Sequence, residues 1–154
     1  MGEQLKKRLL QSRFESPYQE AFLNLLIAAS HLREHAQGVF EPLDVTNGQY
    51  NVLRILKGAH PEGYPRCEIA RRMLERAPDL TRMIDRLVKS GLAERGQSEA
   101  DRRHSITRIT RKGLDLLERA KPALAQVHRT LSDRLSRAEA EELSRLCERL
   151  YGTG

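Results

Sequence analysis

Residues 78–90 place apolar and DNA-compatible polar side chains on opposite faces of one segment. Apolar residues recur at the three- and four-residue spacing of an amphipathic helix: Leu80, Met83, Ile84, Leu87 and Val88. The other face carries acidic, hydroxyl and basic side chains: Asp79, Thr81, Arg82, Arg86 and Lys89. The basic groups could neutralise phosphates or donate to guanine, the hydroxyl could bond a phosphate or a base edge, and the carboxylate could accept from a cytosine amino group. Such a helix could be anchored by its apolar face while the polar face enters the major groove.

Pro78 and Asp79, at the start of this segment, have two explanations. They could approach DNA together with the basic residues. They could also serve only the helix, because proline suits its first position and an acidic side chain suits the positive end of its dipole. Both explanations stay open at this point.

A second polar cluster lies in the segment SEADRRH, between two short stretches rich in Thr and Ile that predict β-strands. Two strands joined by a charged loop would form a ribbon. Arg102, Arg103 and His104 would lie at its tip, where a guanidinium could enter the narrow, electronegative minor groove. Asp101 could brace Arg103 or could simply help to make the turn.

Three further side chains could support chemistry of another kind. His31 and His35 are four residues apart, so a helix could present both imidazoles to a metal ion with Glu34 nearby. No acidic cluster completes such a site, and we predict neither a metal nor another cofactor. Cys67 follows Arg66 at the start of a predicted helix, where a lowered thiol pKa could make it peroxide-reactive; it could equally be a small residue packed beside the helix start.

The positive charge of the chain is confined to its middle third. Lys and Arg number 27 against 21 Asp and Glu, which gives a formal net charge of +6. Residues 1–63 and 114–154 each carry seven basic and seven acidic side chains, whereas residues 64–113 carry thirteen basic and seven acidic ones. The excess suits an anionic partner, nucleic acid or an acidic membrane surface, although a charged segment can also be no more than a solvated face.

Length and composition exclude several classes of protein. A chain of 154 residues has room for one domain, which excludes a large multidomain enzyme. No apolar run reaches the roughly 20 residues that cross a bilayer, and the N-terminus lacks an apolar signal core, so we expect a cytoplasmic protein with no membrane partner. The two cysteines form no CxxC, which argues against a disulfide framework. No catalytic grouping stands out in the sequence, and we expect no enzyme.

Mostly helical elements would position the candidate side chains. Pro17, the capping-box spacings Thr46 to Gln49 and Ser136 to Glu139, and apolar periodicity predict six helices and two strands. The expected helices span 17–37, 46–58, 67–74, 78–90, 110–131 and 136–152, and the strands span 92–97 and 105–110. Residues 1–12 lack clear periodicity and are expected to be a mobile arm. This order is that of a mainly α winged helix-turn-helix protein with flanking helices at both ends.

Four segments carry a resemblance to a known family: VTNGQYNVLRIL, EIARRM, DLTRMIDRLVKSGLAER and ADRRHSITRITRKG. In this order and spacing they cover about half of the chain, and residues 44–118 resemble the MarR (multiple antibiotic resistance regulator) family of bacterial transcription regulators. The resemblance implies that residues 78–90 form the recognition helix and that Arg103 is the wing arginine. Two departures are Leu74, where many helix-turn-helix sequences have Gly, and the segment APDLTR, which replaces the more usual Ser and Thr at the start of the recognition helix.

The family resemblance also implies a dimer that binds pseudo-palindromic double-stranded DNA operators. We expect one domain over residues 1–154, with a DNA-binding lobe at 44–113 and helical dimerisation regions at 14–40 and 114–152. The apolar stripe of the first long helix is wider than a surface helix needs, and leucines stripe the last helix. The predicted dimer-interface residues are Phe22, Leu143, Leu146 and Leu150.

A pocket for a small molecule between the DNA-binding lobe and the dimerisation helices is a further implication of the resemblance. Many family members bind phenolic or other aromatic acids there. By position, His31, His35 and Tyr50 are the polar candidates, although all three could be ordinary core or interface residues. A ligand there would change DNA affinity only through its different affinities for two arrangements of the dimer.

These observations predict a homodimeric, sequence-specific DNA-binding transcriptional regulator, more often a repressor than an activator in this family. The resemblance further implies that a small-molecule effector, such as an aromatic acid, releases it from its operator. Two alternatives remain. The basic ribbon could bind an acidic protein in a winged-helix interaction module, or the regulator could sense oxidants through Cys67. The sequence specifies neither the operator, the regulated genes nor the effector.

Overall fold

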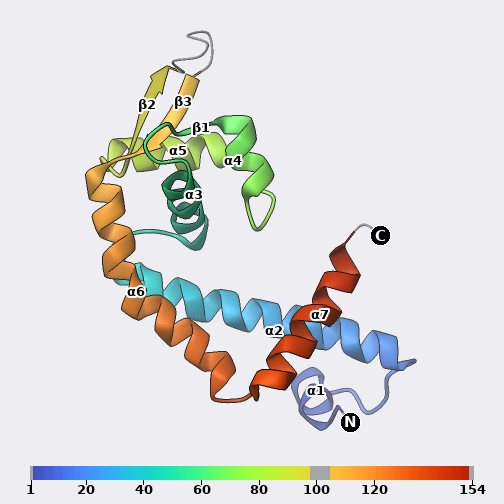
Figure 1. The fold of residues 1–154 in the computed structure, drawn as a ribbon. Coiled ribbons are helices and arrows are strands. Elements are labelled where there is room, and N and C mark those ends of the chain that lie inside the picture. Colours follow the sequence, from blue (N-terminus) through green and yellow to red (C-terminus); the bar gives the residue numbers. More distant parts are fainter. Residues whose placement is uncertain (1, 98–104, 153–154) are drawn as a thin grey trace.

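The computed structural model describes residues 2–97 and 105–152 (Figure 1). It shows a winged lobe joined to a frame, which is formed by the long helices α2, α6 and α7. The mainly helical fold with a small antiparallel sheet is the predicted one. In chain order the elements are α1 (Glu3–Leu9), α2 (Pro17–Phe40), the 3-10 helix η1 (Glu41–Leu43), α3 (Asn47–Gly58), β1 (Tyr64–Pro65), α4 (Arg66–Arg72), α5 (Leu80–Lys89), β2 (Ala93–Gln97), β3 (Ser105–Ile109), α6 (Arg111–Ser132) and α7 (Arg137–Tyr151).

Side-chain caps set the starts of four helices. Ser16, Thr46, Thr110 and Ser136 each accept a hydrogen bond from a backbone N–H in the first turn of the helix that follows. The Thr46 and Ser136 caps are complete capping boxes, because the side chains of Gln49 and Glu139 accept in return from the backbone N–H of the cap residue. The two predicted capping boxes are therefore confirmed.

The predicted C-terminal ends of two helices were wrong. Helix α2 continues through Gly38 to Phe40, because the Phe40 ring is buried and stacks on Tyr50 with centroids 4.3 Å apart. This burial outweighs the roughly 1 kcal/mol that a glycine costs inside a helix. Helix α4 stops at Arg72 rather than at Leu74, whose backbone N–H instead donates to Asn51 Oδ1 at 3.0 Å.

The expected N-terminal arm was also wrong, because residues 3–9 form helix α1. Its one buried side chain is Leu5, which is 3% exposed. A helix held by a single apolar side chain produces no periodicity, so the sequence pattern missed it.

The small sheet has the order β1-β3-β2, with both pairings antiparallel. The predicted ribbon is confirmed by the β2–β3 pairing, which runs from Ala93 opposite Ile109 to Gln97 opposite Ser105. Strand β1 was not predicted, since it has only two residues and one is a proline. The chain approaches β3 through Gly63, whose φ of +82° favours glycine and where a Cβ would lie 2.4 Å from the Thr107 carbonyl oxygen.

The main core lies in the winged lobe and the adjoining ends of α2 and α6. Its buried cluster runs from Phe40 through α3, α4, α5, β2 and β3 to Ala120. By contrast, α7 has no buried residue, and Phe40 is the one buried residue of α2. Within the described ranges, none of the helices is long and apolar enough to span a membrane.

Candidate nucleic-acid interface

Helix α5 separates its two faces as its sequence predicts. Leu80, Ile84 and Leu87 are buried to 2% exposure or less, and the helix packs against α3 and β2. Arg82 and Lys89 lie on the exposed opposite face, and Thr81 is exposed on one flank. The apolar side thus fixes the helix on the lobe and leaves cations directed to solvent.

Arg86 lies on the other flank of this exposed face. It borders a hollow of about 380 Å³ that Glu41 and Asp44 also line. At 100° per residue, Arg82 and Lys89 lie closer than Arg86 to the point opposite the buried stripe. Of the three predicted cations, these two are therefore the outermost.

The start of α5 differs from the prediction, because Pro78 and Asp79 precede the helix. Leu80 N–H donates to the Ala77 carbonyl, which closes a turn around the proline, and Asp79 occupies the cap position with no hydrogen bond from its side chain to the helix. Both residues are exposed. The purely helix-serving explanation of Asp79 therefore has no capping bond to support it.

Ion pairs engage several basic residues of the lobe. The partnered ones are Arg71 and Arg72 with Glu68, Arg95 with Asp85, and Arg111 with Asp115. The Arg72 guanidinium also lies 4.7 Å from the ring centroid of Tyr64. Within residues 2–97 and 105–152, no carboxylate pairs with Arg82, Arg86 or Lys89. The three cations on α5 are thus open to an external anion.

The ribbon is tied to α5 by a contact that the sequence pattern missed. Arg95 on β2 forms an ion pair with Asp85 on the exposed side of α5, and Arg108 Nη2 donates to the Gln97 carbonyl at 3.3 Å. The ion pair connects the ribbon to α5, and the hydrogen bond joins the two strands of the ribbon. The predicted tip residues lie outside the described part of the chain: Asp101, Arg102, Arg103 and His104.

A cavity of about 550 Å³ lies between α2, α3, α6 and the connection from α4 to α5. Its walls are mainly apolar, and Phe40 and Tyr50 both line it. Of the three polar residues proposed for a pocket, only Tyr50 lines this cavity. His31 and His35 are exposed on α2, because each residue along a helix turns by about 100° and the cavity-facing stripe of α2 contains Ala29, Arg33 and Ala36 instead.

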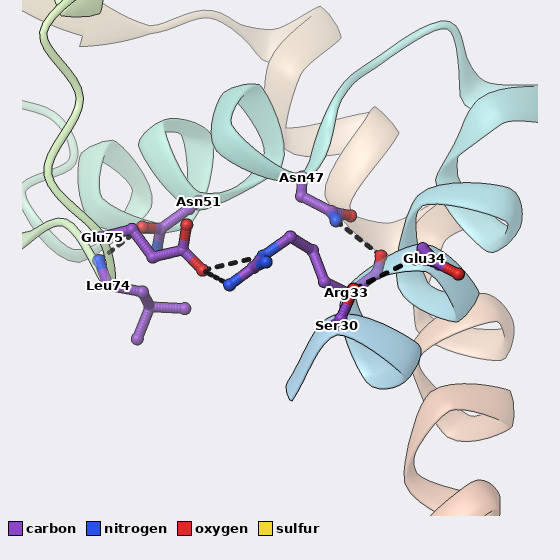
Figure 2. Close-up of polar contacts among 7 residues, drawn as sticks. All are labelled: Ser30, Arg33, Glu34, Asn47, Asn51, Leu74 and Glu75. Atoms are coloured by element: carbon purple, nitrogen blue, oxygen red, sulfur yellow. Dashed lines mark hydrogen bonds and ion pairs between the residues drawn. The ribbon is translucent and has the colours of Figure 1, made fainter. Parts of the chain in front are cut away.

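Polar residues that line this cavity connect α2 to α3 and to the α4–α5 connection (Figure 2). Arg33 Nε and Nη2 donate to the same oxygen of Glu75, at 3.0 and 2.8 Å. Asn47 joins α3 to α2, because its Nδ2 donates to the Arg33 carbonyl and its backbone N–H donates to Gln37 Oε1, both at 3.0 Å. Its Oδ1 is buried and has no hydrogen-bond partner among the described residues. Arg33 shares a helix face with Ala29 and Ala36, and this spacing was the signal that could have identified it.

The remaining candidate residues are exposed. Phe22 is 61% exposed and Leu150 is 73% exposed, and Leu143 and Leu146 are also accessible. Cys67 is exposed in the first turn of α4. In the described ranges, no group of three or more His, Cys, Asp or Glu side chains could hold a metal ion.

The three helices α3, α4 and α5, followed by the β2–β3 ribbon, define a winged helix-turn-helix protein (Figure 1). A model of the MarR family matches residues 45–105. A crystal structure of a MarR transcription factor from Planctomyces limnophilus is 37% identical, covers 88% of this chain and 98% of its own, and superposes with a TM-score of 0.68. The chain belongs to the MarR family of transcription regulators.

Two more distant relatives add detail. The homoprotocatechuate degradative operon repressor of Escherichia coli is 26% identical over 135 residues, which cover 85% of this chain and 90% of the relative. A mutant of Escherichia coli MarR, in a crystal structure with operator DNA, is also 26% identical, with a TM-score of 0.75 and coverage of 89% of this chain and 99% of its own.

Proposed function

We propose that this protein is a homodimeric, sequence-specific DNA-binding repressor that a small aromatic acid releases from its operator. The observation that carries the proposal is the exposed face of α5, whose three cations have no carboxylate partner in the described ranges while its apolar face is fixed in the core. The repressor and the operator complex among the Escherichia coli relatives support the same function.

In this proposal, α5 enters the major groove. Arg82 and Lys89 contact phosphates or guanine, and Arg86 contacts the backbone from the flank. Thr81, Asp79 and Pro78 lie at the end of the helix that would approach the bases. From the sequence, we further propose that Arg102, Arg103 and His104 contact the minor groove, with Asp101 as a brace.

Dimerisation would cover the apolar side chains that the frame exposes. Phe22, Leu143, Leu146 and Leu150 are accessible in the single chain, and α7 has no buried residue, so these helices need a partner surface. We propose that the regions 14–40 and 114–152 supply it in one domain whose DNA-binding lobe is 44–113. Two-fold symmetry would then place half-sites about one helical turn, or ~10 bp, apart.

The cavity beside Tyr50 is the proposed effector site. Its volume of about 550 Å³ lies within the range of roughly 300–1,000 Å³ that is usual for small-molecule sites. The stacked rings of Phe40 and Tyr50 and the apolar side chains around them suit an aromatic body. Among its lining residues, Arg33 and Arg54 are positively charged and Glu75 is negatively charged, so one positive charge is left over for an acid.

Selection of genomic DNA fragments by the purified protein would test this function. The selected duplex should bind far more tightly than a scrambled duplex at the same salt concentration, and its affinity should fall steeply as salt rises because phosphate contacts release counterions. Equal affinity for the two duplexes would reject sequence-specific regulation. Weak binding that does not depend on salt would instead favour the second candidate, an interaction module for an acidic protein.

A further inference from the structure

The ion pair between Arg33 and Glu75 connects two parts of the molecule (Figure 2). Arg33 belongs to α2, a helix of the frame, and Glu75 belongs to the connection between α4 and α5. Both side chains line the cavity and are about half or more exposed, 54% for Arg33 and 67% for Glu75. Exposed ion pairs contribute little to stability, so an incoming anion could exchange with Glu75 at little cost.

The geometry of this pair leaves room for a better partner. Two guanidinium N–H groups of Arg33 donate to a single oxygen, Glu75 Oε1. A carboxylate that offered one oxygen to each N–H would form the bidentate arrangement, in which charge-assisted hydrogen bonds are strongest. An acid with its apolar body beside Tyr50 could present its carboxylate to Arg33 from inside the cavity.

The charges of the cavity also favour a monoanion. Its charged lining residues are Arg33, Arg54 and Glu75, and Arg54 has no ion-pair partner among the residues that the structure describes. One added carboxylate would neutralise the cavity while Glu75 stays among its lining residues, and it would leave a single positive charge once Glu75 turns into solvent.

Glu75 is well placed to transmit this exchange to the DNA-binding helix. The connection that carries it continues directly into α5, and its neighbour Leu74 is held to α3 by the hydrogen bond from Leu74 N–H to Asn51 Oδ1. The Leu74–Asn51 hydrogen bond lies within the DNA-binding lobe, whereas the hydrogen bonds between Glu75 and Arg33 connect the lobe to α2. Breaking the Glu75 bond removes a tie between the frame and the segment that leads into α5.

We propose that the Arg33–Glu75 ion pair is an exchangeable tie: the carboxylate of an aromatic acid in the cavity takes the place of Glu75 on Arg33, and this exchange releases the α4–α5 connection from α2. The inference rests on the proposed function and adds the atoms through which the effector acts. Because the proposed effector lowers DNA affinity, the tied arrangement is the one that binds DNA, and linkage requires that each ligand weaken the other to the same extent.

The first test uses two probes that differ in charge, 2-naphthoate and its neutral counterpart 2-naphthamide, titrated calorimetrically into the full chain. Wild type should bind the acid about tenfold or more tightly than the amide, because charged hydrogen bonds are stronger than neutral ones. Arg33→Gln should bind both probes equally, at the level of the amide. Arg54→Gln should retain most of the preference. Failure of wild type to bind the acid, or loss of the preference in Arg54→Gln rather than in Arg33→Gln, would overturn the inference.

The second test removes the tie without removing the guanidinium. Glu75→Gln should bind 2-naphthoate about two- to fivefold more tightly and bind the selected duplex two- to fivefold more weakly without ligand, as expected for an exposed pair. Glu118→Gln is the matched control, since the Lys57–Glu118 pair is similarly exposed and joins α3 to α6 away from the cavity. Its two affinities should stay unchanged. A Glu75→Gln protein with both affinities unchanged would contradict the exchange.

The two tests separate this inference from the function on which it rests. If wild type does not distinguish the selected duplex from the scrambled one, the proposed function fails. If wild type binds DNA specifically but Arg33→Gln keeps its preference for the acid, only the exchange at Arg33 fails.

Discussion

The DNA-binding lobe and the helical frame of this protein differ in both burial and charge. The lobe holds most of the buried cluster and lies in the part of the sequence with the whole positive excess. Residues 1–63 and 114–154, which include the frame, each have no net charge, and helices α2 and α7 keep large apolar side chains accessible, including Phe22 and Leu150. The lobe is therefore stabilised by its own core, whereas we propose that a second subunit covers the exposed apolar side chains of the frame. The following predictions test this division, from the largest expected effect to the smallest.

Truncation of the lobe core should have the largest effect. Leu53 on α3 is fully buried, and Leu53→Ala should lower the free energy of unfolding by about 2–5 kcal/mol through lost burial and a residual cavity. Urea denaturation monitored by circular dichroism measures this change. At the other end of the comparison, Leu146→Ala makes the same chemical change on the accessible stripe of α7. If Leu146→Ala costs as much as Leu53→Ala at protein concentrations where the chain is a monomer, the division between lobe and frame is wrong.

A charge on the accessible stripe should instead act on association. In Leu146→Glu, a two-fold dimer would bury two unpaired carboxylates, so the dimer dissociation constant should rise by about a hundredfold or more. Analytical ultracentrifugation across a concentration series measures it. Glu148→Ala, on the opposite side of α7, is the control and should leave the dissociation constant unchanged. A dimer equally strong in Leu146→Glu would show that α7 does not form the interface.

Removal of an outermost cation of α5 should weaken DNA binding without affecting folding. Arg82→Ala should cost about 1–3 kcal/mol in affinity for the selected duplex if Arg82 contacts guanine. If it contacts only phosphate, the loss should be the same for selected and scrambled duplexes, and the slope of log affinity against log salt should fall by about one. Fluorescence anisotropy at several salt concentrations separates these cases. The frame substitution Arg149→Ala should change neither affinity; an equal loss there would contradict the assignment of DNA contacts to α5.

Elements whose signals are local were predictable from the sequence. The apolar spacing of α5 and the two capping boxes depend on residues within one or two turns, and the structure has all of them. Features that depend on tertiary contacts were missed. Helix α1 is held by one buried leucine, Leu5, and β1 exists only because Tyr64 and Pro65 pair with β3.

The residues that line the cavity were also hard to predict, because they come together only through tertiary contacts. Tyr50 was identified because it lies in VTNGQYNVLRIL, one of the segments that resemble the family. Arg33 and Glu75 are 42 residues apart in sequence and meet only because the fold brings α2 beside the α4–α5 connection. His31 and His35 on α2 were proposed for the pocket because of their residue type, but both are exposed and lie outside the cavity-facing stripe of the helix. Residue type and spacing therefore predicted the two faces of α5 better than they predicted the polar residues that line the cavity.

The smallest predicted effect compares the two capping boxes, one in each region. Hydrogen bonds from the Ser136 side chain and backbone lower the pKa of Glu139 from its ordinary value of 4.5. A carboxyl whose pKa is lowered in the folded state stabilises the fold above its unfolded pKa, and this contribution is lost as the pH falls through the folded pKa. Gln49 closes the corresponding box of α3 with an amide that does not titrate.

Below about pH 4.5, the start of α7 should therefore fray while the start of α3 stays closed, and amide hydrogen exchange of the first turns would measure both. Glu139→Gln should remove the acid sensitivity of α7, and Gln49→Glu should introduce it in α3; if α7 frays equally in Glu139→Gln, the carboxyl is not the cause.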